Sequence, residues 1–372
     1  ERKKIIKPKK ILQTMIGKIK SLDFKSLFFL ISFSLVINSY IFSNLLIIYF
    51  FLVFSFTSLV ITKYGLKIIK QLNILQSIRD EGPSLHFIKE NTPTMGGILI
   101  ILPFLLLLLI VNNRFDSIGI SLLFFCTISF FVIGFLDDYL SIKNKKNTGL
   151  KSNEKFILQA LVSILFIISA TQKEYINPLI TISNNWSIDT NIIIFPICFL
   201  TLVGLSNAVN LTDGLDGLAS GCSSIVFFGL GTEIFIGNQK ELIIYGLISY
   251  AMSGLCMGFL KYNKHPAKIF MGDTGSLTIG AALGSISILT NSFFTLFIIS
   301  GIFIIEALSV MIQVGFFKIT KKIFKNGRRL FLMTPIHHHF ELMGFKEEVI
   351  VENFWKVNIL LVVLGIVLKI NL

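Results

Sequence analysis

Two aspartates lie three positions apart in the segment NAVNLTDGLDGLAS, residues 207–220. Asp213 and Asp216 are each followed by Gly, and the segment comes at the end of an apolar run. From residue 174 to residue 239 the chain contains no Lys or Arg, so neither carboxylate has a basic neighbour nearby in sequence. Unpaired charges at the end of a membrane helix are costly and usually functional, although a polar loop with two Asx turns is the simpler alternative. We therefore expect a distant basic group, a cation or a ligand to compensate these carboxylates.

A second pair of acids, Asp137 and Asp138, closes another long apolar run in the motif FLDDY. Adjacent carboxylates repel each other and need a cation or a basic partner, whereas a structural cap would need only one. We therefore interpret the pair as functional. The loop that follows supplies lysines that could face a polyanionic substrate: Lys143, Lys145, Lys146, Lys151 and Lys155.

A further acid, Asp273, lies between glycines in the motif FMGDTGS, where the next apolar run begins. Flanking glycines let a metal ion or a phosphate approach the backbone closely. A helix N-cap is the competing explanation, because Asp is common at that position. The motif alone does not decide between the two.

The loop HFIKENTPTMGG, residues 86–97, has the features of an anion site. Pro93 and the Gly pair predict a turn before a helix, whose free N–H groups suit an anion. Lys89 and Thr94 could contact a phosphate there. An ordinary positively charged loop is the alternative.

Three successive histidines, His337, His338 and His339, lie in the motif PIHHHFE. Neighbours on a helix point about 100° apart, so these rings cannot easily share one metal ion. The chain has five His in all and no Cys near this motif, which makes zinc an unfavoured interpretation. We expect the imidazoles to hydrogen-bond a phosphate or a sugar instead.

The composition is that of a membrane protein. Of the 372 residues 53% are hydrophobic and only 15% are charged, whereas soluble proteins carry about 25% charged residues. Apolar runs of about 20 residues recur without strand-like alternation, which predicts a bundle of membrane helices rather than a barrel. The net charge of +13 lies in the loops between these runs and does not indicate a nucleic-acid partner; it indicates topology and attraction to membrane lipid. The four cysteines lie within apolar runs and have no metal-site spacing.

The sequence predicts an all-α polytopic membrane protein of about ten spans. A further run, Leu27–Phe42, follows a basic N-terminus, lacks a signal-peptide cleavage site and leaves an extra N-terminal span open. We expect an N-terminal extension at 1–43 and one catalytic domain at 44–372. The expected spans are 44–62, 96–113, 117–136, 156–171, 191–209, 217–236, 241–260, 276–292, 294–317 and 352–370.

Basic residues predict how the protein lies in the membrane. The loops on one side hold 20 Lys or Arg and those on the other side, with the C-terminus, hold four. By the positive-inside rule the basic side should face the cytoplasm. All the motifs with acidic residues, histidines or the predicted anion loop lie on this side. Carboxylates together with a phosphate substrate suit Mg²⁺, so the expected chemistry is phosphoryl transfer at the membrane surface. A transporter is the competing class, but its charges should lie near the bilayer midplane.

Together the motifs resemble those of the phospho-N-acetylmuramoyl-pentapeptide-transferase family. TPTMGG, DDY, NLTDGLDGLA, FMGDTGSL and PIHHHFE occur in that order, and the resemblance covers about residues 44–372. It implies a ten-helix fold with an active-site cleft on the cytoplasmic face, in a bacterial inner membrane and as a homodimer. It also implies transfer of phospho-MurNAc-pentapeptide from UDP-MurNAc-pentapeptide to undecaprenyl phosphate, giving lipid I and UMP with Mg²⁺. A transferase of another sugar-1-phosphate is the alternative within the superfamily.

The resemblance also assigns residues to roles. It assigns Asp137, Asp138, Asp273 and His338 to catalysis, and Asp273 also to Mg²⁺. It assigns the following to substrate binding: Lys89, Thr94, Lys155, Asn210, Asp213, Asp216, Phe270, Gln313, His337 and His339. The basic N-terminal arm is longer than the lead-in that the family usually has.

Overall fold

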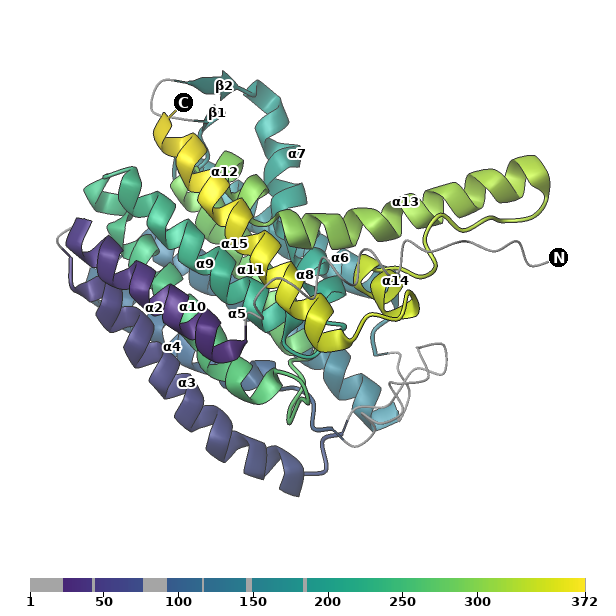
Figure 1. Ribbon diagram of the computed structural model, residues 1–372. Coiled ribbons are helices and arrows are strands. Elements are labelled where there is room, and N and C mark those ends of the chain that lie inside the picture. The colour runs from purple at the N-terminus through teal and green to yellow at the C-terminus, as the bar shows by residue number, and fades with distance from the viewer. Residues whose placement is uncertain are drawn as a thin grey trace.

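The computed structural model describes residues 23–41, 44–75, 92–115, 117–144, 149–182 and 186–371. These residues are overwhelmingly helical, and ten of their helical segments are long and apolar enough to cross a membrane. Figure 1 shows most of them packed side by side as one bundle. The predicted all-α polytopic membrane fold is confirmed. The basic arm, residues 1–22, lies outside the described residues.

The helices in chain order are α2 (Phe24–Ile41), α3 (Leu46–Gln71), α4 (Gly97–Phe115), α5 (Ile118–Asn144), α6 (Ser152–Gln172), η2 (Asn191–Ile193), α7 (Ile194–Phe199), η3 (Leu200–Gly204), α8 (Leu205–Thr212), α9 (Leu218–Ile236), η4 (Lys240–Leu242), α10 (Ile243–Asn263), α11 (Asp273–Thr290), α12 (Phe293–Ile299), α13 (Gly301–Phe324), α14 (Ile336–Leu342) and α15 (Glu347–Asn371). Two short strands, β1 (Leu179–Thr181) and β2 (Ser187–Asp189), pair antiparallel. The sequence pattern did not predict this hairpin.

Helix α2 answers the question that the sequence left open about the N-terminal run. Its length and apolarity are those of a membrane span, and it packs against α3. In addition, the Asn38 side chain donates hydrogen bonds to Thr232 Oγ1 on α9 at 3.0 Å and to Tyr250 Oη on α10 at 3.3 Å. An amide in an apolar setting is stable only when such partners are present. The run is therefore an integral helix of the bundle.

Helices α9, α10 and α11 form the centre of the bundle, and nearly every residue in them is buried. Small residues allow close helix packing. Ser55 of α3 donates to the Gly254 carbonyl at 3.1 Å, and a Cβ at Gly254 would overlap the α3 backbone. Close approach at small residues is the usual way in which membrane helices associate. Helix α11 is rich in Gly, Ser and Thr and is not among the ten apolar spans. It tolerates these polar residues because it is surrounded by protein on all sides.

Two expected spans have irregularities that the apolar pattern did not reveal. The run 191–209 is built from η2, α7, the π-helical turn η3 and α8, and such π-turns often occur near functional sites. The run 294–317 is split between α12 and α13 at Ser300, which is followed by Gly301. A Ser–Gly pair is a common place for a helix to break. Beyond this break α13 extends away from the bundle (Figure 1).

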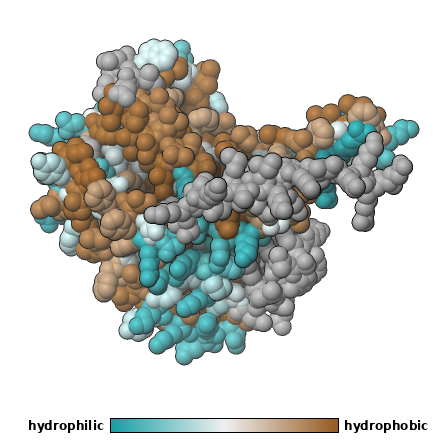
Figure 2. Space-filling model, in the orientation of Figure 1, coloured by the Kyte–Doolittle hydropathy of each residue, from teal (hydrophilic) through white to brown (hydrophobic). Residues whose placement is uncertain are grey.

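Apolar and polar residues occupy different parts of the surface. Figure 2 shows hydrophobic residues over much of the bundle and along α13. Hydrophilic residues gather on the lower part of the bundle, around the lower ends of α10 and α15. The opposite end carries the hairpin and the C-terminus (Figure 1). There the buried Glu233 contacts Lys369 Nζ at 3.2 Å and accepts a hydrogen bond from Ser292 Oγ at 2.6 Å.

Candidate active site

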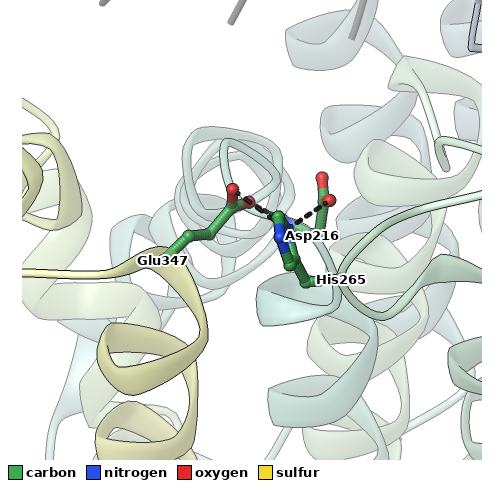
Figure 3. Close-up of side chains that lie close together, drawn as sticks. All are labelled: Asp216, His265 and Glu347. Carbon is green, nitrogen blue, oxygen red and sulfur yellow. Dashed lines mark hydrogen bonds and ion pairs between the residues drawn. The ribbon is translucent and has the colours of Figure 1, made fainter. Parts of the chain in front are cut away.

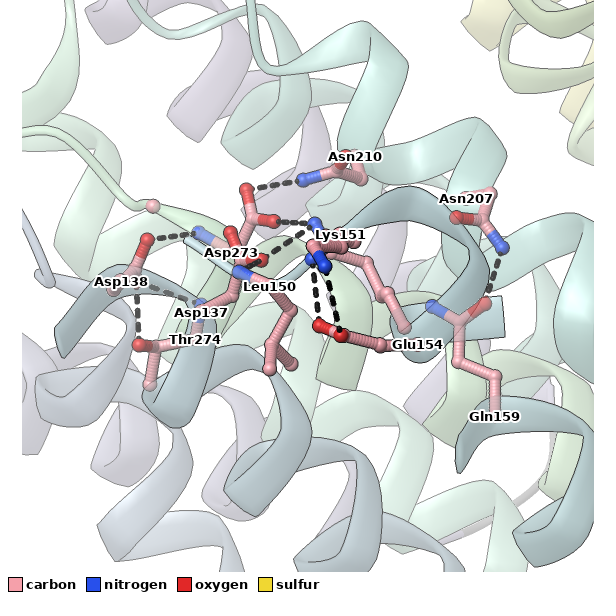
Figure 4. Close-up of polar contacts among 12 residues, drawn as sticks. Asp137, Asp138, Leu150, Lys151, Glu154, Gln159, Asn207, Asn210, Asp273 and Thr274 are labelled. Atoms are coloured by element: carbon pink, nitrogen blue, oxygen red, sulfur yellow. Dashed lines mark hydrogen bonds and ion pairs between the residues drawn. The ribbon is translucent and has the colours of Figure 1, made fainter. Parts of the chain in front are cut away.

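One lysine joins two of the predicted catalytic aspartates. Lys155, in the first turn of α6, places Nζ 3.2 Å from Asp137 Oδ1 and in direct contact with Asp273 Oδ2. Asp137 comes from the last two turns of α5 and also accepts a hydrogen bond from the Leu150 N–H at 2.9 Å. All three side chains are largely buried. Water therefore screens these contacts only weakly. Figure 4 labels Asp137, Asp273 and Leu150 of this cluster.

The other oxygen of Asp273 is held by α8. Asn210 Nδ2 donates to Asp273 Oδ1 at 2.7 Å and to Ser276 Oγ at 3.0 Å. Asp273 is thus fixed from two sides by a lysine and an amide. Four helices, α5, α6, α8 and α11, meet at this carboxylate (Figure 4).

Asp138 has a different environment from its neighbour. It accepts hydrogen bonds from the backbone N–H groups of Asp273 at 3.1 Å and Thr274 at 2.9 Å, and from the Thr274 hydroxyl. A carboxylate at this position satisfies free N–H groups at the start of α11 and interacts favourably with the helix dipole. Gly272 has a φ of +73°, and a Cβ there would press on Asp138. Glycine therefore permits both this backbone turn and the approach of Asp138.

Asp213, which follows α8, lies beside the same group of acids. It accepts a hydrogen bond from the Gly272 N–H. Loss of contact with water, followed by the nearby carboxylates of Asp273 and Asp138, raises the pKa of Asp213 well above its ordinary value. Among the residues that the structure describes, several carboxylates are thus gathered near a single ammonium group, that of Lys155, which favours the binding of a cation.

The described end of the predicted anion loop, residues 92–97, lies beside the start of α11. The Phe270 N–H donates to the Pro93 carbonyl and the Gly96 N–H donates to the Phe270 carbonyl, both at 2.8 Å. A Cβ at Gly97 would overlap the Gly275 backbone, so α4 and α11 cross in direct contact. Thr94 is buried in this turn. Lys89 lies outside the described residues.

Asp216 belongs to a second cluster (Figure 3). Its Oδ2 lies 3.0 Å from His265 Nδ1 and accepts the Ala267 N–H at 3.0 Å, while its own N–H donates to Glu347 Oε1 at 2.7 Å. His265 Nδ1 also lies 3.3 Å from Glu347 Oε2. The compensating groups are thus far away in sequence, as predicted for Asp216. The cluster ties the α8–α9 and α10–α11 loops to the start of α15.

The three histidines of α14 contact different partners. His337 is fully buried with Nδ1 3.1 Å from Glu306 Oε2, and His338 Nδ1 lies 2.6 Å from Glu341 Oε2. His339 Nδ1 accepts the Leu332 N–H at 3.2 Å. The rings of His337 and His338 nevertheless touch edge to face, with their centroids 4.2 Å apart.

Comparison with known proteins gives a consistent picture. Residues 120–291 match the family described as glycosyl transferase family 4, and residues 89–101 match signature 1 of phospho-N-acetylmuramoyl-pentapeptide-transferase. A protein of that name from Prochlorococcus marinus subsp. pastoris strain MED4 is 83% identical over 358 residues, which cover 96% of this chain and all of that protein. A namesake from Synechococcus sp. strain CC9311 is 41% identical over 318 residues, covering 84% and 85% of the two chains.

The chain belongs to the phospho-N-acetylmuramoyl-pentapeptide-transferase family.

The structure brings together part of the set that resemblance to this family implies. Asp137, Asp138, Asp273, Lys155 and Asn210 form one connected network. Asp216 and the histidines belong to neighbouring clusters with contacts of their own. Gln313 holds the loop after α13, because its Oε1 accepts the N–H groups of Leu330 and Phe331, both at 3.0 Å.

Several residues in and around the candidate site were not predicted from sequence. His265 and Glu347 had no motif to mark them, since each lies far in sequence from Asp216. Gln159 Oε1 accepts a hydrogen bond from Asn207 Nδ2 at 2.7 Å, one turn along α6 from Lys155 (Figure 4). Glu306 could have been found, because an acid inside an apolar helix is itself a signal.

The donor set of the candidate site fits a hard divalent cation. Asp137, Asp138 and Asp273 each offer a carboxylate oxygen, and these atoms lie within 4.8 Å of one another. Oxygen donors of this kind suit Mg²⁺. In the described arrangement the Lys155 ammonium supplies positive charge to two of these carboxylates.

Proposed function

We propose that this protein transfers phospho-MurNAc-pentapeptide from UDP-MurNAc-pentapeptide to undecaprenyl phosphate, releasing UMP and forming lipid I. This is the first membrane step of peptidoglycan synthesis. The observation that carries the proposal is the 83% identity to a phospho-N-acetylmuramoyl-pentapeptide-transferase over that protein's whole length. The network of Asp137, Lys155 and Asp273 supports it, because it supplies the charges that phosphoryl transfer needs.

The acceptor needs positioning more than activation. A phosphate monoester has a second pKa near 6, so undecaprenyl phosphate is mostly a dianion at neutral pH. An oxygen of this phosphate attacks the phosphorus that carries the sugar. A new P–O bond forms, the P–O bond to UMP breaks, and UMP leaves with the electron pair. Lys155 offsets the charge of the reacting phosphates, and Asp137 orients the acceptor.

Mg²⁺ is the proposed cofactor, with Asp273 as its main ligand and Asp137 beside it. Bound there, the ion would neutralise charge on the pyrophosphate of the donor. Asn210 orients Asp273 through the hydrogen bond to Oδ1. Asp138 keeps the start of α11 in place through its three hydrogen bonds.

The remaining proposals concern the donor and the setting. The nucleoside would stack on Phe270, with Asp216 nearby, and the substrate-binding roles of Thr94, Gln313 and the histidines follow the family pattern. The site would lie in a cleft on the cytoplasmic face of a bacterial inner membrane, which the excess of basic residues in the loops on that side supports. We also propose a homodimer.

Release of UMP tests the function. Purified protein in detergent with undecaprenyl phosphate and Mg²⁺ should release UMP from UDP-MurNAc-pentapeptide and not from UDP-GlcNAc. Faster release from UDP-GlcNAc would assign the chain to another sugar-1-phosphate transferase. Release from neither, with substrate uptake into vesicles, would favour a transporter. The positions of Asp137, Asp273 and Lys155 at helix ends argue against transport.

A further inference from the structure

Glu306 is a buried acid that the proposed reaction does not use. It lies in the second turn of α13, within the apolar stretch GIFIIEALSVMIQ, and its exposed fraction is 0%. A carboxylate in such surroundings is costly unless it is paired. Glu306 therefore requires a compensating group close by.

That group is His337, the first residue of the histidine triplet. Its Nδ1 lies 3.1 Å from Glu306 Oε2, and both side chains are fully buried. Among the described residues neither side chain has a hydrogen-bond partner, so this close charge contact is what Glu306 has for compensation. Glu233, a second buried acid, instead contacts Lys369 and Ser292. Glu306 thus depends on one imidazole.

The opposite edge of the His337 ring faces the central acidic motif. A Cβ added at Gly214 would overlap His337 Nε2, so the ring packs directly against the backbone between Asp213 and Asp216. The imidazole is therefore held between a carboxylate on α13 and the loop that leads from α8 to α9.

We propose that Glu306 is a positioning residue of the transferase. It fixes the His337 ring by its carboxylate, and the ring in turn fixes the Gly214 backbone and the aspartates on either side of it. Glu306 touches neither substrate nor metal. The inference rests on the proposed transferase function, because it assigns a role in that site.

Kinetics of matched variants provide the first test. Glu306→Gln keeps the shape and removes the charge. It should lower kcat about tenfold and raise KM for the UDP substrate, because Asp213 and Asp216 lie at the proposed donor site, while KM for undecaprenyl phosphate changes less than about twofold. The control Glu233→Gln neutralises a buried acid at the other end of the bundle and should keep kcat within about twofold of wild type. A wild-type kcat in Glu306→Gln would overturn the proposal.

A double-mutant cycle tests whether Glu306 acts through His337. If it does, Glu306→Gln should add almost nothing to the loss of kcat caused by His337→Asn, because coupled residues are not additive. Losses that multiply would show that the carboxylate acts independently and would overturn the proposal. Thermal unfolding midpoints in detergent are measured for every variant.

A spectroscopic readout on the unmodified protein needs neither activity nor a stable variant. With ¹⁵N-labelled histidine, only five rings give signals, and the His337 ring should show a protonated Nδ1 that exchanges slowly with solvent. An unprotonated Nδ1 would overturn the inference even if every variant unfolded. Absence of UMP release by wild-type protein would instead count against the proposed function alone.

Discussion

At the residue scale, Asp273 is the point at which the contacts of the site converge. It takes Lys155 on one oxygen and Asn210 on the other, and its own N–H bonds to Asp138. Motif spacing indicated that Asp273 matters but left open whether it serves a metal or a helix cap. In the structure Asp138 caps the start of α11, because it accepts the N–H groups of Asp273 and Thr274. The sequence could not show this, since Asp138 and Asp273 lie far apart in the chain.

We expect Asp273→Asn to abolish UMP release while the protein remains folded. The amide keeps the shape, but its single oxygen can accept from only one of Asn210 and Lys155, and it loses the charge that a hard cation requires. UMP release and Mg²⁺-dependent thermal stabilisation are the measurements. Glu154→Gln, at an exposed acid on α6, is the matched control. Near-normal turnover and Mg²⁺ response in Asp273→Asn would contradict the assignment.

We expect Asp213→Asn to raise thermal stability. The pKa of Asp213 is raised by desolvation and by Asp273 and Asp138, so the folded state holds its proton more tightly than the unfolded state does. The contribution of Asp213 to the free energy of unfolding is fully present below its pKa in the unfolded chain, about 4. It falls as the pH rises towards the higher pKa that Asp213 has in the folded protein. The Asn variant avoids this loss. Its gain in unfolding midpoint should thus be larger at pH 7.5 than at pH 5, and an equal gain at both would refute the explanation.

At the element scale, the site depends on how closely helices approach one another. The start of α11 touches α4 through Gly97 and Gly275, and it touches α5 through Gly134, where a Cβ would overlap the Asp273 backbone. The sequence shows these glycines but not their partners, since the contacts join separate helices. Likewise the apolar pattern predicted 294–317 as one span, because a Ser–Gly pair does not interrupt hydrophobicity even where it breaks a helix.

We expect Gly97→Ala to destabilise the protein and reduce turnover, because the new methyl group would collide with the α11 backbone rather than with a flexible side chain. Overpacking of this kind costs about 1–3 kcal/mol. Gly315→Ala, on α13, meets nothing within 4 Å and should be neutral or slightly stabilising. The thermal unfolding midpoint in detergent and the rate of UMP release are measured for both variants and compared with wild type. Equal midpoints and rates in the two variants would contradict the close contact between α4 and α11.

At the scale of the whole molecule, the sequence predicted the class of fold, and the structure brings the predicted Asp137, Asp138 and Asp273 together. Long apolar runs indicate membrane helices directly, and the aspartates at the ends of these runs indicate a candidate site. Pairings such as Glu306 with His337 or Asp216 with His265 were out of reach, because no periodic pattern records which distant segments meet. The N-terminal helix was also ambiguous, since its 18 residues are only just long enough to span.

We expect Asn38→Leu to loosen α2 from the bundle, because the amide bonds to α9 and α10 would be lost. Hydrogen bonds between membrane helices contribute about 1–2 kcal/mol in model systems. The thermal midpoint should fall, whereas Ile37→Leu, at an exposed neighbour on α2, should leave it unchanged. An unaltered midpoint in Asn38→Leu would mean that α2 is held by apolar packing alone.

The partners of Asn38 also impose an order on biosynthesis. Thr232 and Tyr250 lie 194 and 212 residues further along the chain. At about 5–20 residues per second, the ribosome needs roughly 10–40 seconds to deliver them. During that interval the nascent α2 has a polar amide in the bilayer without its final partners, and α3 waits equally for Gly254. Insertion of the first helices therefore precedes their packing, and α2 completes its polar contacts only after α10 has entered the membrane.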